Sequence, residues 1–595
     1  MLWALDSEPV YRTGSWSFAQ GTGEITTITF AGVPVLWGIQ TIARDADWGT
    51  LSWLAEEPTL SDTGATSTLR VGLRSSDQSL AGSMVISVET THLCVTCDLV
   101  AQRDLMTNRT GLVVLHHPDL AGQPLTVVHP DGSTSALSFP SDIAPFQPAF
   151  DVAGYRWEHN GHEIELAFEG DVFEMEDQRN WTDASFKTYS RPLSAPFPYR
   201  VRAGEHIVNS VRVSVHSAQQ EHRHRLASSA LPRYEVELVE EGEMPLFALG
   251  ASTAPDPQPA LPGSVATAPL LVELDLASTN WRAALDRACR TARSLDVRLI
   301  ASDTDSVTSP YLQDAISRLA RCEDAGIAIE RIGLFSSATH GATTALADCL
   351  IALRDSAHRS WRMIGGTRAH FTELNREHPS MALNVDEIGF SSTPLFHQES
   401  TGQIIDAIAM QRITARQAVT ISRSLPGPAR PIVVGPITLR PRFNNVATRT
   451  QPAPVRADLR DGYGAEFAGT NDRRQAADEL AAWLVSSAAA FAVPGVRSIT
   501  FFEQWGPRGL VDAQGVPFPI ADAFREVSAL RGALLWSEQT TEPVWALGSR
   551  TTDDERVLVA NLSPHDTLVD VHLAGSRREG RARLNPFSFE RVIVK

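Results

Sequence analysis

Eight short apolar runs alternate with amphipathic or polar stretches between residues 245 and 506, and this alternation restricts the possible folds more than any other feature. Repeated strand–helix units are typical of parallel sheets covered by helices. Eight units fit a closed (β/α)8 barrel better than an open sheet, because no glycine-rich phosphate turn follows the first strand. The expected strands are 245–252, 270–276, 297–303, 330–336, 363–375, 387–397, 431–440 and 498–506.

Two of the intervening stretches show the helical spacing of apolar residues clearly. Trp281–Leu295 and Gln475–Phe491 each carry alanine and leucine on one face. The stretch STAPDPQPALPGSVATAP after the first strand is an exception, because it is too rich in proline for an ordinary helix. The first helix of the barrel is therefore expected to be short or missing.

The chain on either side of the barrel has strand patterns. From Trp16 to Ser217, short alternating runs separated by turns predict a large antiparallel β-sandwich. From about Leu535, strand-like runs return and predict a small C-terminal β-sandwich unit that packs on the barrel or joins the first sandwich. The predicted fold class is multidomain, β plus α/β, with domains at residues 1–230, 231–534 and 535–595.

Charge and cysteine content limit the partners. The formal net charge of −18 argues against nucleic acid and anionic membrane surfaces and favours a small or neutral ligand. We expect a cytoplasmic protein, because the sequence shows neither a leader nor a membrane span. Five cysteines indicate reduced thiols, and the spacing of Cys94 and Cys97 places them on opposite faces of a strand. No metal and no cofactor are expected, and the oligomeric state stays open.

In a (β/α)8 barrel the working residues lie at the carboxyl ends of the strands, which selects a small set of candidates. Glu373 follows the fifth expected strand and Glu503 ends the eighth. Two carboxylates in one cavity can divide the roles of acid and base, because each raises the proton affinity of the other. Taken alone, each glutamate is better explained as an ion-pair partner or a helix cap. The candidate substrate-binding residues from the barrel are His370, Asn375, Arg440 and Trp505, and the carboxyl-end rule also retains Arg442.

The stretch FEMEDQRNWTDASFKTY, residues 173–189, combines acids, bases, amides and aromatic residues with almost no aliphatic ones. We expect it to form a long loop that projects from the sandwich and reaches over the barrel mouth. The alternative is a polar loop whose Arg179 and Lys187 pair with neighbouring acids. Dense donors and acceptors suit a polyhydroxylated or carboxylate ligand. The candidate binding residues of this loop are Glu176, Asp177, Arg179, Asn180, Trp181, Asp183 and Lys187.

The stretch 173–189, together with GGTRAHFTELNRE, PITLRPRFN and FFEQWGPRG, resembles the D-apionate lactonase family of bacterial apiose catabolism over most of the chain. The resemblance implies hydrolysis of the five-membered D-apionolactone to D-apionate in the cytoplasm. It supplies no catalytic residues. The chain departs from the family pattern in its degraded first barrel helix and in TPLFHQES after the sixth strand.

Opening a lactone requires a base for water, stabilisation of the carbonyl oxyanion and a proton for the leaving alkoxide. We predict Glu373 as the base and Glu503 as the acid, two roles that are interchangeable at this stage. The predicted electrostatic clamp is Arg179 or Lys187.

Three alternatives stay open. A glycoside hydrolase would use the same glutamates, although barrel glycosidases of this architecture carry theirs after strands four and seven. A non-catalytic carbohydrate-binding protein would hold the sugar without turning it over. A metal-assisted lactonase has less support, because no HExxH motif is present.

Overall fold

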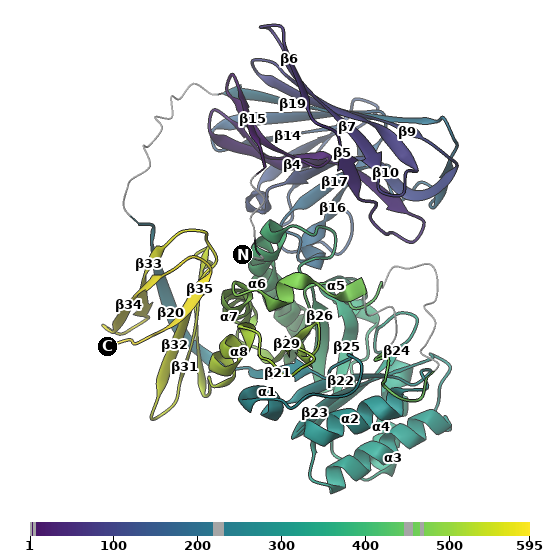
Figure 1. Ribbon diagram of the computed structural model, residues 1–595, viewed down its shortest axis with the longest axis vertical. Helices are drawn as coiled ribbons and strands as arrows, with labels where there is room; N and C mark the ends of the chain where they lie inside the picture. The colour runs from purple at the N-terminus through teal and green to yellow at the C-terminus, as the bar shows by residue number, and fades with distance from the viewer. Residues whose placement is uncertain (1–2, 4–7, 218–230, 445–455, 464–468) are drawn as a thin grey trace.

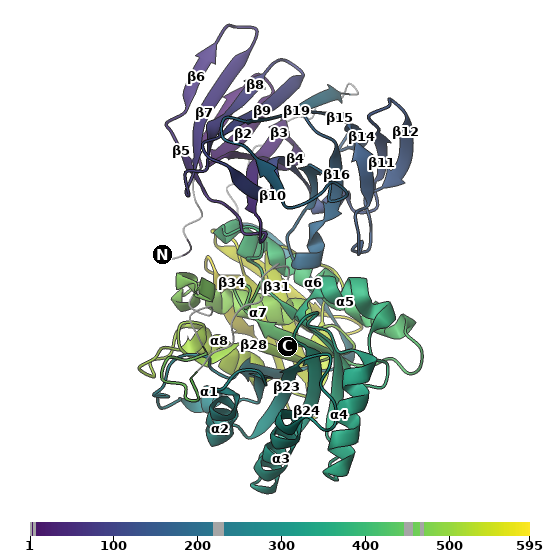
Figure 2. The same ribbon diagram turned by 90° about the vertical axis from the view of Figure 1, so that its right-hand side faces the viewer.

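The computed structural model describes residues 3, 8–217, 231–444, 456–463 and 469–595. A β-sandwich lies over one end of a barrel, and a third, C-terminal sheet flanks the side of the barrel (Figures 1 and 2). The predicted fold class, multidomain β plus an α/β barrel, is confirmed. The predicted boundary at residue 230 falls in the segment 218–230, outside the described residues.

The sandwich consists of two antiparallel sheets that bury one apolar core between them. Strands such as β9, in which every second residue is buried, show why the alternating sequence folds this way. The first sheet contains β1 (Val10–Thr13), β2 (Trp16–Gly21), β3 (Glu24–Phe30), β4 (Val33–Asp45), β10 (Leu105–His116), β13 (Ala149–Val152), β16 (Phe173–Asp177), β17 (Phe186–Ser190) and β18 (Tyr199–Val201). The second contains β5 (Trp53–Ala55), β6 (Thr59–Asp62), β7 (Ser67–Ser75), β8 (Leu80–Val88), β9 (His92–Ala101), β11 (Pro124–Val128), β12 (Thr134–Ser138), β14 (Gly154–His159), β15 (His162–Glu169) and β19 (His206–Ser217).

The barrel is closed, because its first strand pairs in parallel with its eighth, with Leu246 opposite Ser498. Its strands are nearly continuous apolar runs, as expected for parallel strands that are covered on both faces. They are β21 (Leu246–Gly250), β22 (Leu270–Asp275), β23 (Ser294–Ala301), β24 (Ala328–Ser336), β25 (Arg362–His370), β26 (Glu387–Ser392), β27 (Ile432–Ile437) and β28 (Val496–Trp505), with β29 (Gly509–Val511) beside the last.

The helices follow the predicted alternation, and the first is short, as its prolines indicated. They are α1 (Gly263–Thr267), α2 (Trp281–Thr291), α3 (Pro310–Asp324), α4 (Thr344–Ser356), α5 (Phe371–Glu377), α6 (Thr401–Ser424), α7 (Leu480–Phe491) and α8 (Ile520–Ser528). Every residue of α7 is buried, because the helix lies between the barrel and the C-terminal sheet.

Two predicted strands run well past the observed ends. The strand expected over 363–375 ends at His370, and the chain turns at once into α5, so Glu373 and Asn375 are helical. Hydrogen bonds from Thr372 and Asn375 to the sandwich stabilise this helix, and they are tertiary contacts that no local pattern reveals. The strand expected over 387–397 ends at Ser392, just before Pro394, which has no backbone donor for a sheet.

The C-terminal sheet has seven strands in the order β34-β33-β20-β30-β31-β32-β35 and curls until it is nearly closed. It includes β20, which precedes the barrel in the chain and pairs in parallel with β33. The predicted boundaries had placed β20 with the barrel. The strands are β20 (Arg233–Glu243), β30 (Ala533–Trp536), β31 (Val544–Arg550), β32 (Glu555–Asn561), β33 (Thr567–Leu573), β34 (Glu579–Leu584) and β35 (Ser588–Val592).

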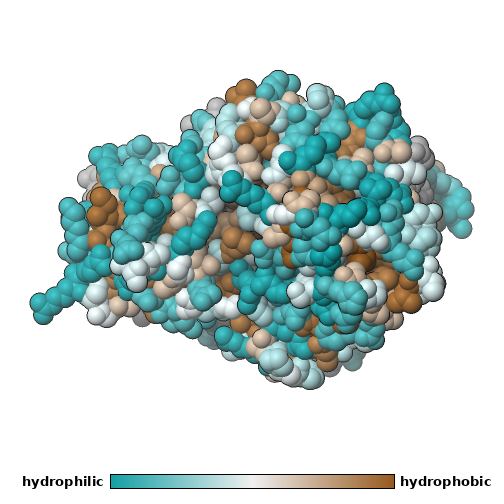
Figure 3. Space-filling model, turned by 90° about the horizontal axis from the view of Figure 1, so that it is seen from below, coloured by the Kyte–Doolittle hydropathy of each residue, from teal (hydrophilic) through white to brown (hydrophobic). Residues whose placement is uncertain are grey.

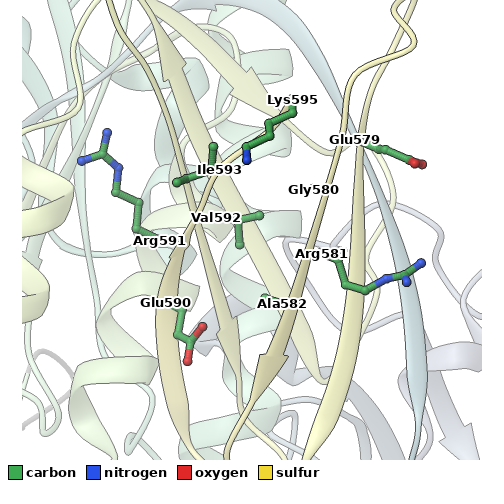
Figure 4. A pocket seen from close by; sticks show the side chains of 9 residues that line it. All are labelled: Glu579, Gly580, Arg581, Ala582, Glu590, Arg591, Val592, Ile593 and Lys595. Carbon is green, nitrogen blue, oxygen red and sulfur yellow. The ribbon is translucent and has the colours of Figure 1, made fainter.

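A seam between β34 and β35 separates the two edges of this sheet (Figure 4). The backbones of Glu579 and Lys595 exchange two hydrogen bonds of 3.1 Å at one end of the seam. Gly580 allows the close approach, since a Cβ there would lie 2.7 Å from Cγ1 of Val592. The charged side chains of Arg581 and Arg591 point away from the seam (Figure 4).

The surface seen from below is mostly hydrophilic, with small, separate hydrophobic areas (Figure 3). None of the described helices has the length and apolar character that crossing a membrane requires. Cys94 and Cys97 lie on opposite faces of β9, as predicted, and only Cys97 is fully buried. The sulfurs of Cys289 on α2 and Cys322 on α3 are 2.8 Å apart.

Candidate functional site

A cavity of about 580 Å³ lies between the sandwich and the mouth of the barrel, and residues of both units line it. We call it the shared cavity. Its lining combines flat aromatic surfaces with positive charge, a combination that suits a sugar, whose C–H faces stack while its polar groups bind. The aromatic lining residues are Trp48, Trp181, Tyr189, Phe197, Phe396 and Phe443, and the arginines are Arg44, Arg109, Arg376, Arg440 and Arg442.

Residues 173–189, which we call the arm, form one wall of this site. The arm is a hairpin of β16 and β17 joined by a 3-10 turn at Gln178–Trp181, and not the long loop expected from the sequence. Its tip lies against the barrel, because Thr372 Oγ1 donates to the Asn180 carbonyl at 3.0 Å and Thr182 Oγ1 donates to the Thr393 carbonyl at 2.8 Å. The arm therefore meets the chain that follows β25 and β26.

Asp177 and Arg179 lie inside the arm. Arg179 donates from Nε to Asp177 Oδ1 at 2.8 Å and from Nη2 to Oδ2 at 2.7 Å, and its guanidinium lies 4.4 Å from the Phe186 ring centre. It also donates to the carbonyls of Pro140 and Asp142. Both side chains are almost fully buried, so the structure places them inside the arm and away from the lining of the shared cavity.

A second buried ion pair lies within the arm, and residues of the barrel bond to its carboxylate. Lys187 Nζ lies 2.6 Å from Asp183 Oδ2, and His397 Nδ1 lies 2.8 Å from the same oxygen. Gln403 of α6 donates to Asp183 Oδ1 at 3.3 Å. Burial alone would raise the pKa of Asp183, but Lys187 and His397 outweigh it and lower the pKa to about 2. The imidazole of His397 lines the shared cavity.

Glu176 is the lining carboxylate that the arm contributes. Its Oε1 accepts from Arg109 Nη1 at 2.8 Å, and its Oε2 accepts from Gln178 Nε2 at 2.7 Å. Burial would raise the pKa of Glu176, but Arg109 outweighs it, and the pKa is lowered. Glu176 therefore stays ionised, which suits the acceptance of hydroxyl hydrogen bonds more than the donation of a proton.

Two lining arginines form no ion pair with a carboxylate in the described part of the chain, although Arg376 interacts electrostatically with Glu176. Arg376 donates from Nε to the Pro145 carbonyl at 2.6 Å and lies 5.1 Å from the Trp181 ring centre. Arg44 donates to Thr50 Oγ1. By contrast, Arg440 pairs with Glu399 and Asp472, and Arg442 pairs with Glu273. The shared cavity therefore holds excess positive charge contributed by both units.

The predicted glutamates lie elsewhere on the barrel mouth. Glu503 lies near the end of β28, where its oxygens accept from the Thr253 amide at 3.0 Å and from Thr253 Oγ1 at 2.8 Å, while Arg508 lies 2.7 Å away. Glu373 lies in the first turn of α5. Neither is among the described residues that line the shared cavity, although Arg508 also donates to Thr470 on its rim.

The remaining predicted residues support the walls or the floor. Asn375 Nδ2 donates to Asn180 Oδ1 at 3.0 Å, so these two side chains join the arm to α5. His370 ends β25, and its buried ring lies edge-on to Phe396, with 4.7 Å between the ring centres. Trp505 is buried behind the mouth, where its carbonyl accepts from Ser252.

The predicted residues that line the shared cavity are Glu176, Trp181, Arg440 and Arg442. Sequence reasoning did not single out His397, Arg376, Arg44 or Arg109. His397 lies in TPLFHQES after the sixth strand, a place that the carboxyl-end rule selects, but its pairing with Asp183 becomes visible only in the folded chain. Among the residues that the structure describes, no group of three or more histidines, cysteines or carboxylates is arranged to hold a metal ion.

Comparison with known proteins matches two family models to the chain. The N-terminal domain of D-apionate lactonase matches residues 4–218, and the TIM barrel domain of D-apionate lactonase matches residues 251–532. A curated D-apionate lactonase of Brucella anthropi is 28% identical over 582 residues, which is 92% of each chain.

Solved structures resemble the chain more distantly. A GH30 endoxylanase from Clostridium papyrosolvens, 9% identical, covers 60% of this chain and 99% of its own, with a TM-score of 0.37. A family 51 arabinofuranosidase from Bifidobacterium longum, 10% identical, covers 61% of this chain and 99% of its own, with a TM-score of 0.40. Scores this low carry no inference about activity.

Proposed function

Because the chain belongs to the D-apionate lactonase family, we propose that it hydrolyses D-apionolactone to D-apionate in the shared cavity, in the cytoplasm. The observation that carries the proposal is the excess positive charge of Arg44 and Arg376 beside the aromatic lining residues. The volume of about 580 Å³ falls within the range of roughly 300–1,000 Å³ that is usual for small-molecule sites.

The charge of the site fits the course of lactone hydrolysis. Water adds to the carbonyl carbon, an oxyanion develops there, and the bond to the ring oxygen breaks as that oxygen takes up a proton. A neutral lactone becomes a carboxylate. Guanidinium groups without a carboxylate partner can stabilise both the oxyanion and the product, since charge-assisted hydrogen bonds are stronger than neutral ones. Arg376 and Arg44 supply these groups from the barrel and the sandwich respectively.

The acid–base roles of Glu373 and Glu503 stay a prediction. If these residues perform the chemistry, Glu373→Gln and Glu503→Gln should each lower turnover by about 10²-fold or more. Near-normal turnover in both variants would rule out the acid–base roles of Glu373 and Glu503. It would not affect the proposal that hydrolysis takes place in the shared cavity.

The function is tested with the purified full chain, D-apionolactone, other sugar lactones and a panel of aryl glycosides. We expect acid release from D-apionolactone and no cleavage of the glycosides. Glycoside cleavage without lactone opening would favour a glycoside hydrolase. Tight sugar binding without any turnover would favour a carbohydrate-binding protein. Either result would overturn the proposal.

A further inference from the structure

We propose that His397 is the general base that activates water for lactone opening, and that Asp183 of the arm positions it. This inference rests on the proposed function and gives His397 the role predicted from the sequence for Glu373. It makes the catalytic centre a product of both structural units, because the base comes from the loop after β26 and its positioning carboxylate comes from the sandwich.

The geometry fixes the tautomer of the imidazole. Asp183 Oδ2 also contacts the ammonium of Lys187, so Asp183 stays ionised and can only accept a hydrogen bond from His397 Nδ1. A proton on Nδ1 leaves a lone pair on Nε2. Within the described ranges, Nε2 of His397 makes no hydrogen bond, and it is accessible because it is not among the buried atoms that lack a partner. His397 also lines the shared cavity. The free lone pair therefore opens toward the space where substrate and water would lie.

The surroundings hold the ring in place and keep it neutral. Trp181 and Phe396 pack edge-on or nearly edge-on to the imidazole, with ring centres 5.2 and 4.6 Å away. Burial lowers the pKa of His397 and outweighs Asp183, which raises it, while the cations Lys187 and Arg44 lower it further.

Two other titratable groups face this histidine. They are Glu176 across the cavity and His370 at the end of β25, and each interacts electrostatically with His397. With its pKa below the usual 6.5, His397 is an unprotonated base at neutral pH.

His397 alone can carry out both proton transfers that the reaction requires. Nε2 takes a proton from water as the water oxygen bonds to the carbonyl carbon. When the tetrahedral intermediate collapses, the bond from carbon to the ring oxygen breaks, and the proton on Nε2 passes to that oxygen. The new carboxylic acid loses its proton to solvent, which leaves the carboxylate beside Arg376 and Arg44. No metal ion or other reactant is consumed.

The test is His397→Asn, because the asparagine amide can still donate to Asp183 while the base is lost. We expect kcat to fall by about 10²- to 10⁴-fold with KM little changed, and D-apionate to bind with near-normal affinity in calorimetry. The matched control is His206→Asn. His206 Nδ1 lies 2.9 Å from Asp98 Oδ1 in another histidine–aspartate pair, but on the exposed face of the sandwich, and its substitution should leave kcat unchanged.

The pH profile gives a second readout, and its first part uses the wild-type chain alone. In the wild-type chain, kcat/KM should fall as the pH drops below the pKa of His397. In Asp183→Asn the fall should move to lower pH, because Asp183 raises that pKa, and kcat should also drop.

The outcomes separate the two proposals. If the wild-type chain opens no sugar lactone, the proposed function and this inference fall together. Lactone opening that survives in His397→Asn at the wild-type kcat would overturn the inference alone. An acid limb that stays at the same pH in Asp183→Asn as in the wild-type chain would also overturn it.

Discussion

The charged residues of the arm and of the adjoining α5 differ in function according to where their counter-charges lie. Arg179 and Lys187 have carboxylates beside them inside the arm, so their charge stabilises the hairpin. Arg376 has aromatic rings and a carbonyl around it, so its charge is available to a ligand. Nothing in the sequence separates these cations, because the difference arises from tertiary contacts. The residue types in the sequence therefore predicted a charged site, but they did not predict which of its charged side chains are available to a ligand.

At this scale, substitution of Arg376 tests product binding. Arg376→Met removes the positive charge but keeps much of the apolar stem against Trp181. We expect the Kd for D-apionate to rise about tenfold, the usual effect of losing one charge-assisted hydrogen bond, with a smaller effect on the uncharged lactone. Calorimetry measures both. Arg416→Met on the exposed side of α6 is the control, and equal affinities in both variants would contradict the prediction.

Glu503 offers a second residue-scale test. Its oxygens already accept from Thr253 and pair with Arg508, which suits support of the barrel mouth. We expect Glu503→Gln to lower Tm, because the ion pair between Glu503 and Arg508 is lost, and to keep kcat within about tenfold. Thermal unfolding and steady-state kinetics measure the two effects. A loss of 10²-fold or more in kcat at unchanged Tm would instead favour the acid role.

At the scale of elements, the sequence predicted the eight barrel strands and the degraded first helix because both depend on local patterns. It misplaced the end of β25, since HFTELNRE can continue a strand and becomes helical only where Thr372 and Asn375 bond to the arm. It also took the arm for a loop, because β16 and β17 carry polar residues that are buried by pairing with each other. Elements stabilised by distant partners give no local signal.

The helices α2 and α3 lead to an element-scale prediction. The sulfurs of Cys289 and Cys322 are 2.8 Å apart and both side chains are partly exposed. Incubation with oxidised glutathione should join them, each sulfur losing its hydrogen as the reagent is reduced to two thiols. Mass spectrometry of peptides should show the cross-link, and closing this loop should stabilise the fold by about 3 kcal/mol. Cys289→Ser should abolish both effects, and two freely alkylated thiols after oxidation would contradict the prediction.

At the scale of the whole molecule, the three units meet at a cluster of acids. Asp406 of α6 is partly buried near Glu542, which precedes β31, and near His117, which follows β10. Burial, with the charge of Glu542 adding to it, raises the pKa of Asp406 to about 7. The folded state therefore prefers the protonated carboxyl. The stability that it contributes is complete below the ordinary pKa of 3.8 and is lost as the pH rises toward 7.

Asp406→Asn tests this junction, because it keeps the shape and removes the charge. We expect a higher Tm than wild type at about pH 8 and no difference at about pH 4. The exposed Asp553→Asn serves as control and should show no such dependence. Differential scanning calorimetry measures Tm across this pH range. A difference in Tm between wild type and Asp406→Asn that stays the same at every pH would contradict the prediction.

The position of β20 in the C-terminal sheet has a consequence for synthesis on the ribosome. Arg233 pairs with Leu568, so this strand leaves the exit tunnel roughly three hundred residues before its neighbour does. Until then, Val236 and Leu238 cannot be buried in the core of the C-terminal sheet. The face of α7 that packs on β31 and β32 is likewise uncovered. A chain that stops at residue 534 would leave these apolar surfaces and the edge of β20 exposed, and we expect it to aggregate. Synthesis of the last sixty or so residues covers them and so ends this risk.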